Sequence, residues 1–205
     1  MDVKDIKEFL QQDEIKELIA ENDLEGVYHK YASQGDVASE ISEYLLDIGV
    51  NPIDYFEKSI PDFAFHDCDR LTEAVINNSV TDIGYMAFYD CTSLASVFIP
   101  AGVTRIGEKA FAYCRDLVDV TFGENSNLRT IGYAAFHYCD YLASITIPAS
   151  VTTIGSYAFY YCTSLTDIYY KGTKKQWTKI IKCVHWDTDT PVEVIHCIDG
   201  DISLE

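Results

Sequence analysis

Two pairs of residues that could bind a metal ion lie near the end of the chain. Cys183 and His185 are separated by one residue, and His196 is followed directly by Cys197. Thiolate and imidazole are common ligands of Zn²⁺, so the two pairs could support a zinc-dependent activity. Their spacing matches no familiar zinc finger, however, and Cys197 ends a predicted strand. We therefore expect these side chains to be packing residues, and we predict no metal site and no cofactor.

The rest of the sequence contains no recognisable catalytic motif. It has no phosphate-binding loop, no dinucleotide fingerprint, and neither the HExxH nor the GxSxG pattern. His29, His66 and His137 are not paired in sequence with a convincing nucleophile. His137 occupies a position that other copies of the repeat described below fill with Tyr or Ala, which favours a surface residue over a general base. We predict that the protein is not an enzyme.

The dominant pattern of the chain is a repeat that reads Ile-Gly-x-x-Ala-Phe-x-x-Cys. Four complete copies lie between Ile83 and Cys162, and a degenerate copy precedes them at Ala64 to Cys68. Successive phenylalanines are 23, 23, 25 and 23 residues apart, at Phe65, Phe88, Phe111, Phe136 and Phe159. Such a fixed period is typical of solenoids, in which each unit packs only against its neighbours and which usually bind other macromolecules.

Five of the seven cysteines share the last position of this repeat. Adjacent rungs of a solenoid lie about 4.7–4.9 Å apart, but side chains in one column point the same way, which is poor geometry for a disulfide. Free cysteine packs well as a small buried group, and the odd total argues against a complete set of disulfides. We expect a column of buried free thiols at Cys68, Cys91, Cys114, Cys139 and Cys162.

Each repeat also contains two extended segments and a turn. A Leu-x-x-Val-x-Ile pattern, as at residues 94–99, has the alternation of a half-buried strand, and a shorter extended segment ends at the repeat glycine. We expect the Ala-Phe-x-x-Cys segment to form a helical turn that closes the rung. The two extra residues of the third repeat fall in the polar stretch 123–127, which predicts a surface loop.

The two ends of the chain do not follow the repeat. Residues 1–60 show helical spacing and hold 15 acids against 5 bases, which predicts an acidic helical N-terminal cap. Residues 61–170 form the predicted solenoid of about five 23-residue rungs. Residues 171–205 predict a mixed C-terminal cap, with a helix from Lys174 to Lys182 and a closing strand at 192–195. Caps are needed because an open solenoid end exposes apolar core and an unpaired strand edge.

The formal net charge of −18 restricts the class of partner. A nucleic-acid backbone would be repelled, whereas a partly basic protein would be attracted, so we expect no direct binding of nucleic acid. No apolar run approaches the roughly 20 residues of a membrane helix, so we expect no membrane partner. The first residues lack a basic segment followed by an apolar stretch, which predicts no secretory signal and a location in the cytosol.

The repeat resembles the unit of the BspA-like (Treponema-type) leucine-rich repeat family over roughly residues 60–170. That unit runs L-x-x-I-x-I-P-x-x-V-x-x-I-G-x-x-A-F-x-x-C, and the stretch from Tyr169 to Trp177 is similar to the family's C-terminal end unit. The resemblance implies an α+β solenoid, a leucine-rich-repeat right-handed superhelix that serves as a binding scaffold. Members are often secreted or displayed on the cell surface, and this chain departs from them in lacking a visible signal.

Two surfaces of the predicted solenoid could contact a partner. Outward positions of the long strands form a strand face with Phe98, Asp119, Thr121, Thr146, Asp167 and Tyr169. Tyrosines that precede the repeat cysteine form a stripe on the turn-bearing, convex side, at Tyr113, Tyr138 and Tyr161. Tyrosine is enriched at interfaces, but it also covers grooves between rungs, so both surfaces stay open as binding sites.

We therefore predict a non-catalytic protein–protein interaction module that acts in the cytosol. One alternative is an inhibitor encoded by a phage or mobile element, which would use the acidic cap to neutralise a host nucleic-acid-binding defence protein. The helical N-terminal segment is similar to the caps of small repeat proteins that such elements carry. The other alternative is the zinc-dependent activity at the C-terminal Cys/His cluster.

Overall fold

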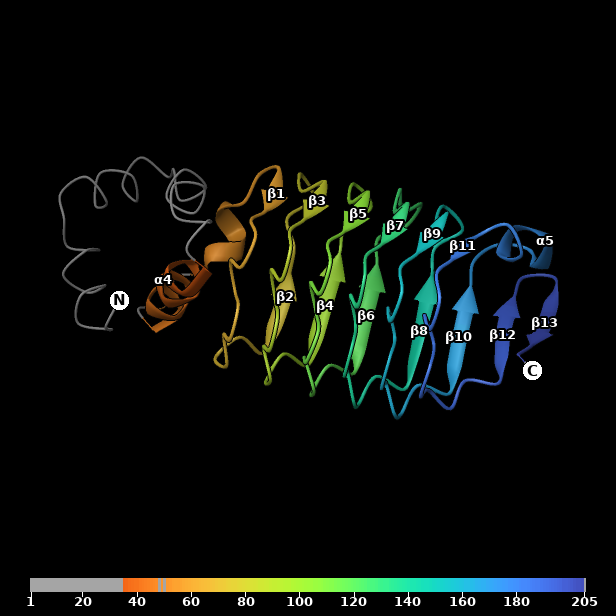
Figure 1. Ribbon diagram of the computed structural model, residues 1–205. Coiled ribbons are helices and arrows are strands. Elements are labelled where there is room, and N and C mark those ends of the chain that lie inside the picture. The colour runs from red at the N-terminus through yellow and green to blue at the C-terminus, as the bar shows by residue number, and fades with distance from the viewer. Residues whose placement is uncertain (1–34, 48, 50, 205) are drawn as a thin grey trace.

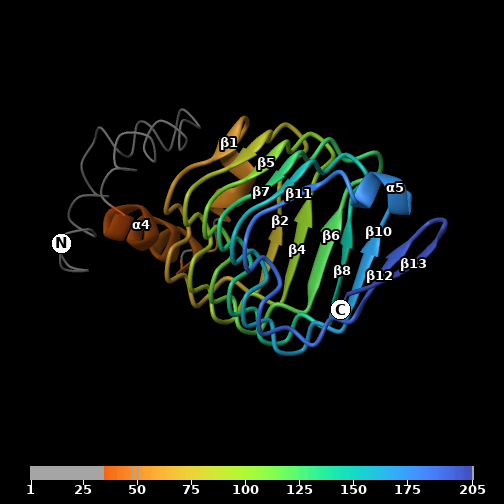
Figure 2. The same cartoon turned by 45° about the vertical axis from the view of Figure 1, so that its right-hand side comes forward.

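The chain forms an elongated solenoid whose turns are stacked along one axis. The computed structural model describes residues 35–47, 49 and 51–204, so the helices expected before residue 35 lie outside the described residues. Helix α4 (Gly35–Asp47) lies at one end, and helix α5 (Lys174–Trp177) and the C-terminal hairpin lie at the other (Figure 1). Seen from a second direction, the long and the short strands form two separate walls of the stack (Figure 2).

The short strands form one parallel sheet that runs the length of the solenoid. Its six strands are paired in the order β1-β3-β5-β7-β9-β11, one from each turn. The fold therefore has about six turns, one more than the repeat predicts, because β11 continues this sheet from within the segment predicted to be the C-terminal cap. The strands are β1 (Ser59–Ile60), β3 (Asp82–Ile83), β5 (Arg105–Ile106), β7 (Thr130–Ile131), β9 (Thr153–Ile154) and β11 (Ile181–Lys182).

The long strands form two sheets with a break between them. The first contains β2 (Glu73–Val75), β4 (Ser96–Ile99) and β6 (Asp119–Phe122), all parallel. The second contains β8 (Ser144–Ile147), β10 (Asp167–Tyr170) and β12 (Val194–Cys197), with β13 (Gly200–Ser203) added antiparallel at its edge. In the described chain β6 does not pair with β8. The break coincides with the predicted surface loop at residues 123–127, which follows β6.

The core is a continuous stack of phenylalanine rings. Neighbouring rings of the five repeat phenylalanines lie 4.9, 5.0, 5.4 and 5.5 Å apart between centroids and are parallel within 6°. The ring of Phe56 covers one end of the stack edge-on at 6.0 Å, and the ring of Trp186 covers the other at 6.2 Å. All five stacked side chains are fully buried, so the end members are enclosed as completely as the central ones.

The Ala-Phe-x-x-Cys segment is not helical, and this prediction is wrong. In an α-helix all of its N–H groups would bond within the helix, but here alternate N–H groups donate to the next rung, and those between them bond three residues back, as in tight turns. In the third rung, the N–H groups of Lys109, Phe111 and Tyr113 donate to carbonyls of the fourth at 2.8, 2.8 and 2.7 Å. Lys109 and Tyr113 have φ angles of 55° and 65°, and this left-handed conformation recurs twice in every turn. The residues concerned are Phe63, Met86, Lys109, Ala134, Tyr157 and His185, and Asp67, Asp90, Tyr113, Tyr138, Tyr161 and Asp189.

The repeat cysteines are buried free thiols, as predicted. Each thiol from the second rung onward donates to the carbonyl of the stacked phenylalanine one rung earlier. The distances from Sγ to O are 2.8 Å for Cys91 to Phe65 and 3.0 Å for Cys114 to Phe88. A small buried side chain with one donor therefore suits this position, because it fills the rung and also satisfies a buried carbonyl.

Helix α4 and the 3-10 helix η1 (Pro52–Tyr55) cover the first turn. Ile41 and Leu45 of α4 are fully buried, and the Ser42 hydroxyl donates to the carbonyl of Ala64 in the first rung. An apolar helix face that packs onto the open end of a solenoid removes core surface from water, which is the role expected of a cap. None of the helices in the described residues is long and apolar enough to cross a membrane.

At the other end, helix α5 is shorter than the predicted Lys174–Lys182 helix. Thr173 and Gln176 form a capping box at its start. The chain then turns to join the short-strand sheet at β11. The Lys182 ammonium donates to the carbonyls of Trp177 and Ile180 at 2.9 and 3.2 Å and so satisfies acceptors at the end of the short helix. Pairing of β11 with β9 explains why the helical spacing does not continue.

Replacing a stacked phenylalanine should destabilise the fold strongly at the end of the stack as well as in its middle. Phe111→Ala is expected to lower the free energy of unfolding by about 3–5 kcal/mol, as truncations of buried Phe do. Phe65→Ala should cost about the same, because Phe56 covers its outer face. Urea denaturation measures both losses, with Tyr141→Ala, which is 61% exposed, as the control. A much smaller loss at Phe65 would show that the N-terminal helices do not close the stack.

The repeat thiols should resist alkylation in the folded protein. Burial raises the pKa of Cys91 and of Cys139 well above the usual value, so these thiols stay protonated in mildly alkaline solution. A thiol reagent should modify half-buried Cys183 and Cys197 first and all seven cysteines only after denaturation. Mass spectrometry of modified peptides gives the order. A disulfide between two repeat cysteines in freshly purified protein would contradict the buried-thiol arrangement.

Candidate protein-interaction surfaces

A row of stacked tyrosine rings runs along the turn side of the solenoid. We call Tyr89, Tyr113, Tyr138 and Tyr161 the tyrosine ridge. Their ring centroids are separated by 5.3, 5.0 and 4.8 Å, and the last two contacts are nearly parallel, at 12° and 15°. The rings come from four successive rungs and are all half-buried. The three tyrosines predicted at this surface, Tyr113, Tyr138 and Tyr161, are therefore brought together by the fold.

Charged residues surround the ridge. The Arg115 guanidinium lies 5.8 Å from the ring centroids of both Tyr113 and Tyr138, and it pairs with Asp140 at 3.2 Å. Asp67 and Asp90 occupy, in the first two rungs, the repeat position that Tyr113, Tyr138 and Tyr161 occupy in the next three. Burial, and then the neighbouring Asp67 carboxylate, raise the pKa of Asp90. A cation placed at this end of the ridge would relieve that repulsion.

His137, which the sequence predicts to be a surface residue, is half-buried and packs against the ridge. Its ring lies 4.6 Å from that of Tyr138 and 5.1 Å from that of Tyr160. Burial, and then the charge of Lys109, lower its pKa and favour the neutral imidazole. Its buried Nε2 atom has no hydrogen-bond partner among the described residues. A histidine that fills space between tyrosines suits a packing role better than a general base.

The predicted strand face is divided into two parts. In the first long-strand sheet, Val75, Phe98 and Thr121 are aligned across β2, β4 and β6, and Asp119 lies in the parallel row beside them. In the second sheet, Thr146 and Tyr169 are aligned across β8 and β10. The break between β6 and β8 separates the two sets. Each row exists as predicted, but the rows do not join into one hydrogen-bonded face.

The second part of the strand face contains a cluster that sequence reasoning missed. His196 on β12 contacts Asp201 on β13 through Nδ1 at 3.0 Å and Asp167 on β10 through Nε2 at 3.1 Å. The rings of Tyr169 and His196 are stacked at 4.9 Å. Hydrogen bonds that His196 donates to Asp201 and to Asp167 raise its pKa, with Asp201 having the larger effect. Aligning residues 194–197 with the strand pattern at 167–170 would have placed His196 beside Tyr169, but the antiparallel return that brings Asp201 has no counterpart in the repeat.

The structure does not assemble the Cys/His pairs into a metal site. Cys183 follows β11 in the short-strand sheet, whereas His196 and Cys197 belong to β12 in the long-strand sheet. His196 uses both ring nitrogens on carboxylates. Among the described residues, no three or more side chains of the metal-binding types gather around one point. The zinc-dependent alternative therefore has no supporting geometry.

The His196 cluster should make the stability of the C-terminal strands depend on pH. Because the pKa of His196 is raised on folding, its stabilising effect is complete below about 6.5 and is lost as pH rises through the folded pKa. Hydrogen bonds from Thr166 and then from His196 lower the pKa of Asp167. The stability that its ionised carboxylate contributes is therefore lost only as pH falls below about 4. Relative to His196→Gln, the parent chain should be most stabilised between these limits. Urea denaturation from pH 4 to pH 9 tests this, and equal pH dependence of the two chains would contradict it.

Comparison with known proteins identifies the repeat. Residues 58–181 match the BspA type leucine-rich repeat region in six copies. A leucine-rich repeat protein from Bacteroides ovatus is 31% identical with a TM-score of 0.55, and the match covers 67% of this chain and 34% of that protein. A leucine-rich repeat protein from Bacteroides capillosus is 38% identical with a TM-score of 0.45, covering 49% of this chain and 78% of that one. Among curated proteins, none matches.

The likeness is concentrated in the solenoid. The chain spans about a third of the length of the Bacteroides ovatus protein. The leucine-rich repeat protein of T. pallidum is 26% identical with a TM-score of 0.41, and the match covers 49% of this chain and 59% of that one. The matched repeats account for more than half of the sequence and include the stacked phenylalanines and the thiol column. The chain therefore belongs to the BspA type leucine-rich repeat family.

Proposed function

We propose that this protein is a non-catalytic protein-interaction module and that its partner docks along the tyrosine ridge. The observation that carries the proposal is the continuity of the ridge. Tyr113 and Tyr138 precede β6 and β8, the two strands between which the long-strand sheet breaks, yet their rings are stacked at 5.0 Å. The ridge thus continues through four rungs, whereas the hydrogen bonding of the strand face is interrupted between β6 and β8, which remain neighbours.

The ridge has the chemistry of a protein-binding surface. Tyrosine combines a large apolar ring with a polar hydroxyl, and it has few rotatable bonds to immobilise on binding. Stacking between rungs already holds Tyr138 between Tyr113 and Tyr161. The side chain therefore loses less conformational entropy when a partner binds. A preorganised row of this kind favours a partner that lies along the solenoid axis.

The charges beside the ridge favour a partly basic partner. Asp67, which contacts His66 at 3.0 Å, and Asp90 lie at one end of the ridge, and the whole chain carries a net charge of −18. Such a field speeds association with a positively charged surface. The same charge pattern makes direct binding of nucleic acid unfavourable.

A location in the cytosol remains a prediction, and the buried free thiols favour it, because reducing compartments keep thiols unpaired. The inhibitor alternative depends on acidic side chains of residues 1–60, most of which lie outside the described residues. The interaction module is therefore the function that the described geometry supports best.

Site-specific cross-linking in the producing cells tests which surface is used. A photoreactive phenylalanine analogue replaces Tyr161 on the ridge in one variant and Thr121 on the strand face in another. We expect a discrete cross-linked protein from position 161 and none from position 121. Adducts from position 121 alone, or from neither position, would overturn the proposal.

The isolated partner then allows a quantitative test. Tyr113→Ala combined with Tyr138→Ala should weaken its binding by at least about tenfold, since hot-spot side chains contribute about 2 kcal/mol or more each. Thr121→Ala combined with Thr146→Ala is the matched control on the strand face and should leave the affinity unchanged. Circular dichroism confirms that each variant is folded. Equal losses from the two pairs would mean that the ridge is not the specific contact.

A further inference from the structure

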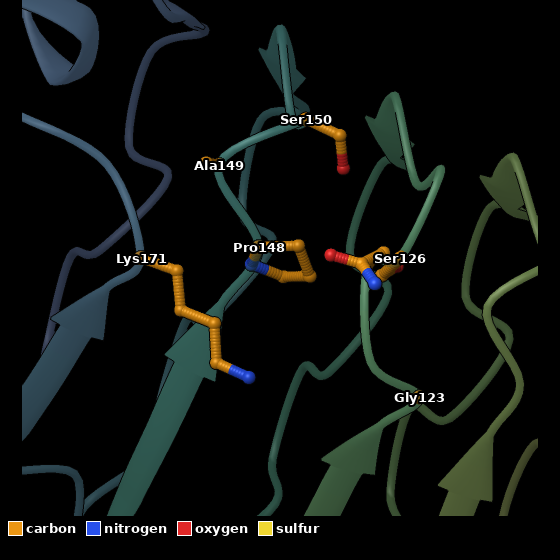
Figure 3. Close-up of a pocket in the computed structure, with 7 residues that line it drawn as sticks. Gly123, Ser126, Pro148, Ala149, Ser150 and Lys171 are labelled. Atoms are coloured by element: carbon orange, nitrogen blue, oxygen red, sulfur yellow. The ribbon is translucent and has the colours of Figure 1, made fainter.

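A small pocket lies at the point where the long-strand sheet breaks. It has a volume of about 240 Å³ and opens between the loop after β6 and the segments after β8 and β10 (Figure 3). Its walls come from three successive rungs, because Gly123, Pro148 and Lys171 are the first residues after these three strands. The complete lining is Gly123, Asn125, Ser126, Pro148, Ala149, Ser150 and Lys171.

The two additional residues of the third repeat form part of this pocket. They lengthen the loop at 123–127, and Asn125 adopts a left-handed conformation with φ of 54°. The loop can begin only at a glycine, since a Cβ atom on Gly123 would lie 2.6 Å from the backbone nitrogen of Ala101. The pocket is thus a local feature built into one rung and does not recur with the 23-residue period.

The polar side chains of the pocket are two serine hydroxyls, the Asn125 amide and one positively charged group, Lys171. The Lys171 side chain extends past Pro148 on one side of the pocket, and the Ser150 hydroxyl points toward Ser126 from the other (Figure 3). Ser150 Oγ is buried and has no hydrogen-bond partner in the part of the chain that the structure describes. A buried hydroxyl without a partner costs free energy, which a ligand acceptor would recover.

The charge of the pocket is opposite to that of the molecule. The chain has 33 acidic and 15 basic residues, yet no Asp or Glu contributes to the lining. Pro148, Ala149 and Gly123 supply apolar walls beside Lys171. One ammonium group matches one negative charge, whereas a second negative charge would face the field of a strongly acidic protein.

From this arrangement we propose that the pocket binds a carboxylate group. The Lys171 ammonium pairs with the carboxylate, and Pro148 and Ala149 contact the carbon attached to it. A rotation of the buried Ser150 side chain toward the pocket lets its hydroxyl donate to one carboxylate oxygen. The volume is below the roughly 300 Å³ of pockets for drug-sized ligands, so the site holds a small molecule or the end of a longer one. The proposal is independent of the surface that binds the protein partner.

Nuclear magnetic resonance titration of the full chain tests this site. Sodium acetate is the probe, and acetamide is its uncharged counterpart. Acetate should produce saturable shifts of the amide signals of Gly123, Ser126 and Ser150, and acetamide should not. Lys171→Gln should weaken acetate binding by at least about tenfold. The matched control, Lys179→Gln, removes an exposed lysine outside the pocket and should bind as the parent chain does.

A second variant removes the pocket itself. Deleting Glu124 and Asn125 restores the 23-residue spacing and should abolish the acetate shifts while the stacked core stays folded. An N-acetylated dipeptide with a free C-terminus, compared with its amidated form, shows whether a peptide end binds more tightly than acetate. Shifts that do not saturate, that survive Lys171→Gln, or that inorganic phosphate produces at lower concentration than acetate would overturn the proposal.

Discussion

Each turn of this solenoid has to place a phenylalanine ring flat against the ring of the turn before it. The five rings lie about 5 Å apart and are closed at both ends by Phe56 and Trp186. Strands in a ladder have nearly the same spacing, so ring stacking and backbone pairing reinforce each other along one axis. The rest of the molecule depends on this shared period, because any side chain at a given repeat position is carried to the same place one rung further on.

The period also determines the backbone on the turn side. Alternate N–H groups there bond to the following rung, and the others bond within their own segment. Two residues per turn adopt a left-handed conformation in this arrangement. That conformation costs about 1 kcal/mol or more for residues other than glycine, yet Tyr113 and Tyr138 adopt it. The bonds between rungs offset this cost, and the same geometry stacks the ridge tyrosines with one another.

The local sites of this chain lie in the segments that do not follow the 23-residue repeat. The loop at 123–127 interrupts the long-strand sheet and opens the pocket beside Lys171. The antiparallel return of β13 brings Asp201 to His196. The phenylalanine stack is continuous beside both the loop at 123–127 and the β13 strand, since the stacked rings lie away from these segments. A repeat protein can therefore acquire local sites without losing the stack that stabilises it.

The spacing of the phenylalanines and cysteines was enough to predict the solenoid, the buried core and the free thiol column, because a repeated residue in a stacked fold must meet its own copies. It also placed Tyr113, Tyr138 and Tyr161 on one stripe. It could not distinguish a helical turn from the pair of turns that replaces it, since Ala-Phe-x-x-Cys suits both and only the bonds to the next rung decide. Nor could it show that β6 and β8 lack hydrogen bonds to each other, that β11 and β12 add a further turn, or that His196 contacts two carboxylates. Those features depend on contacts between segments that share no repeat, and such contacts exist only once the turns are stacked in space.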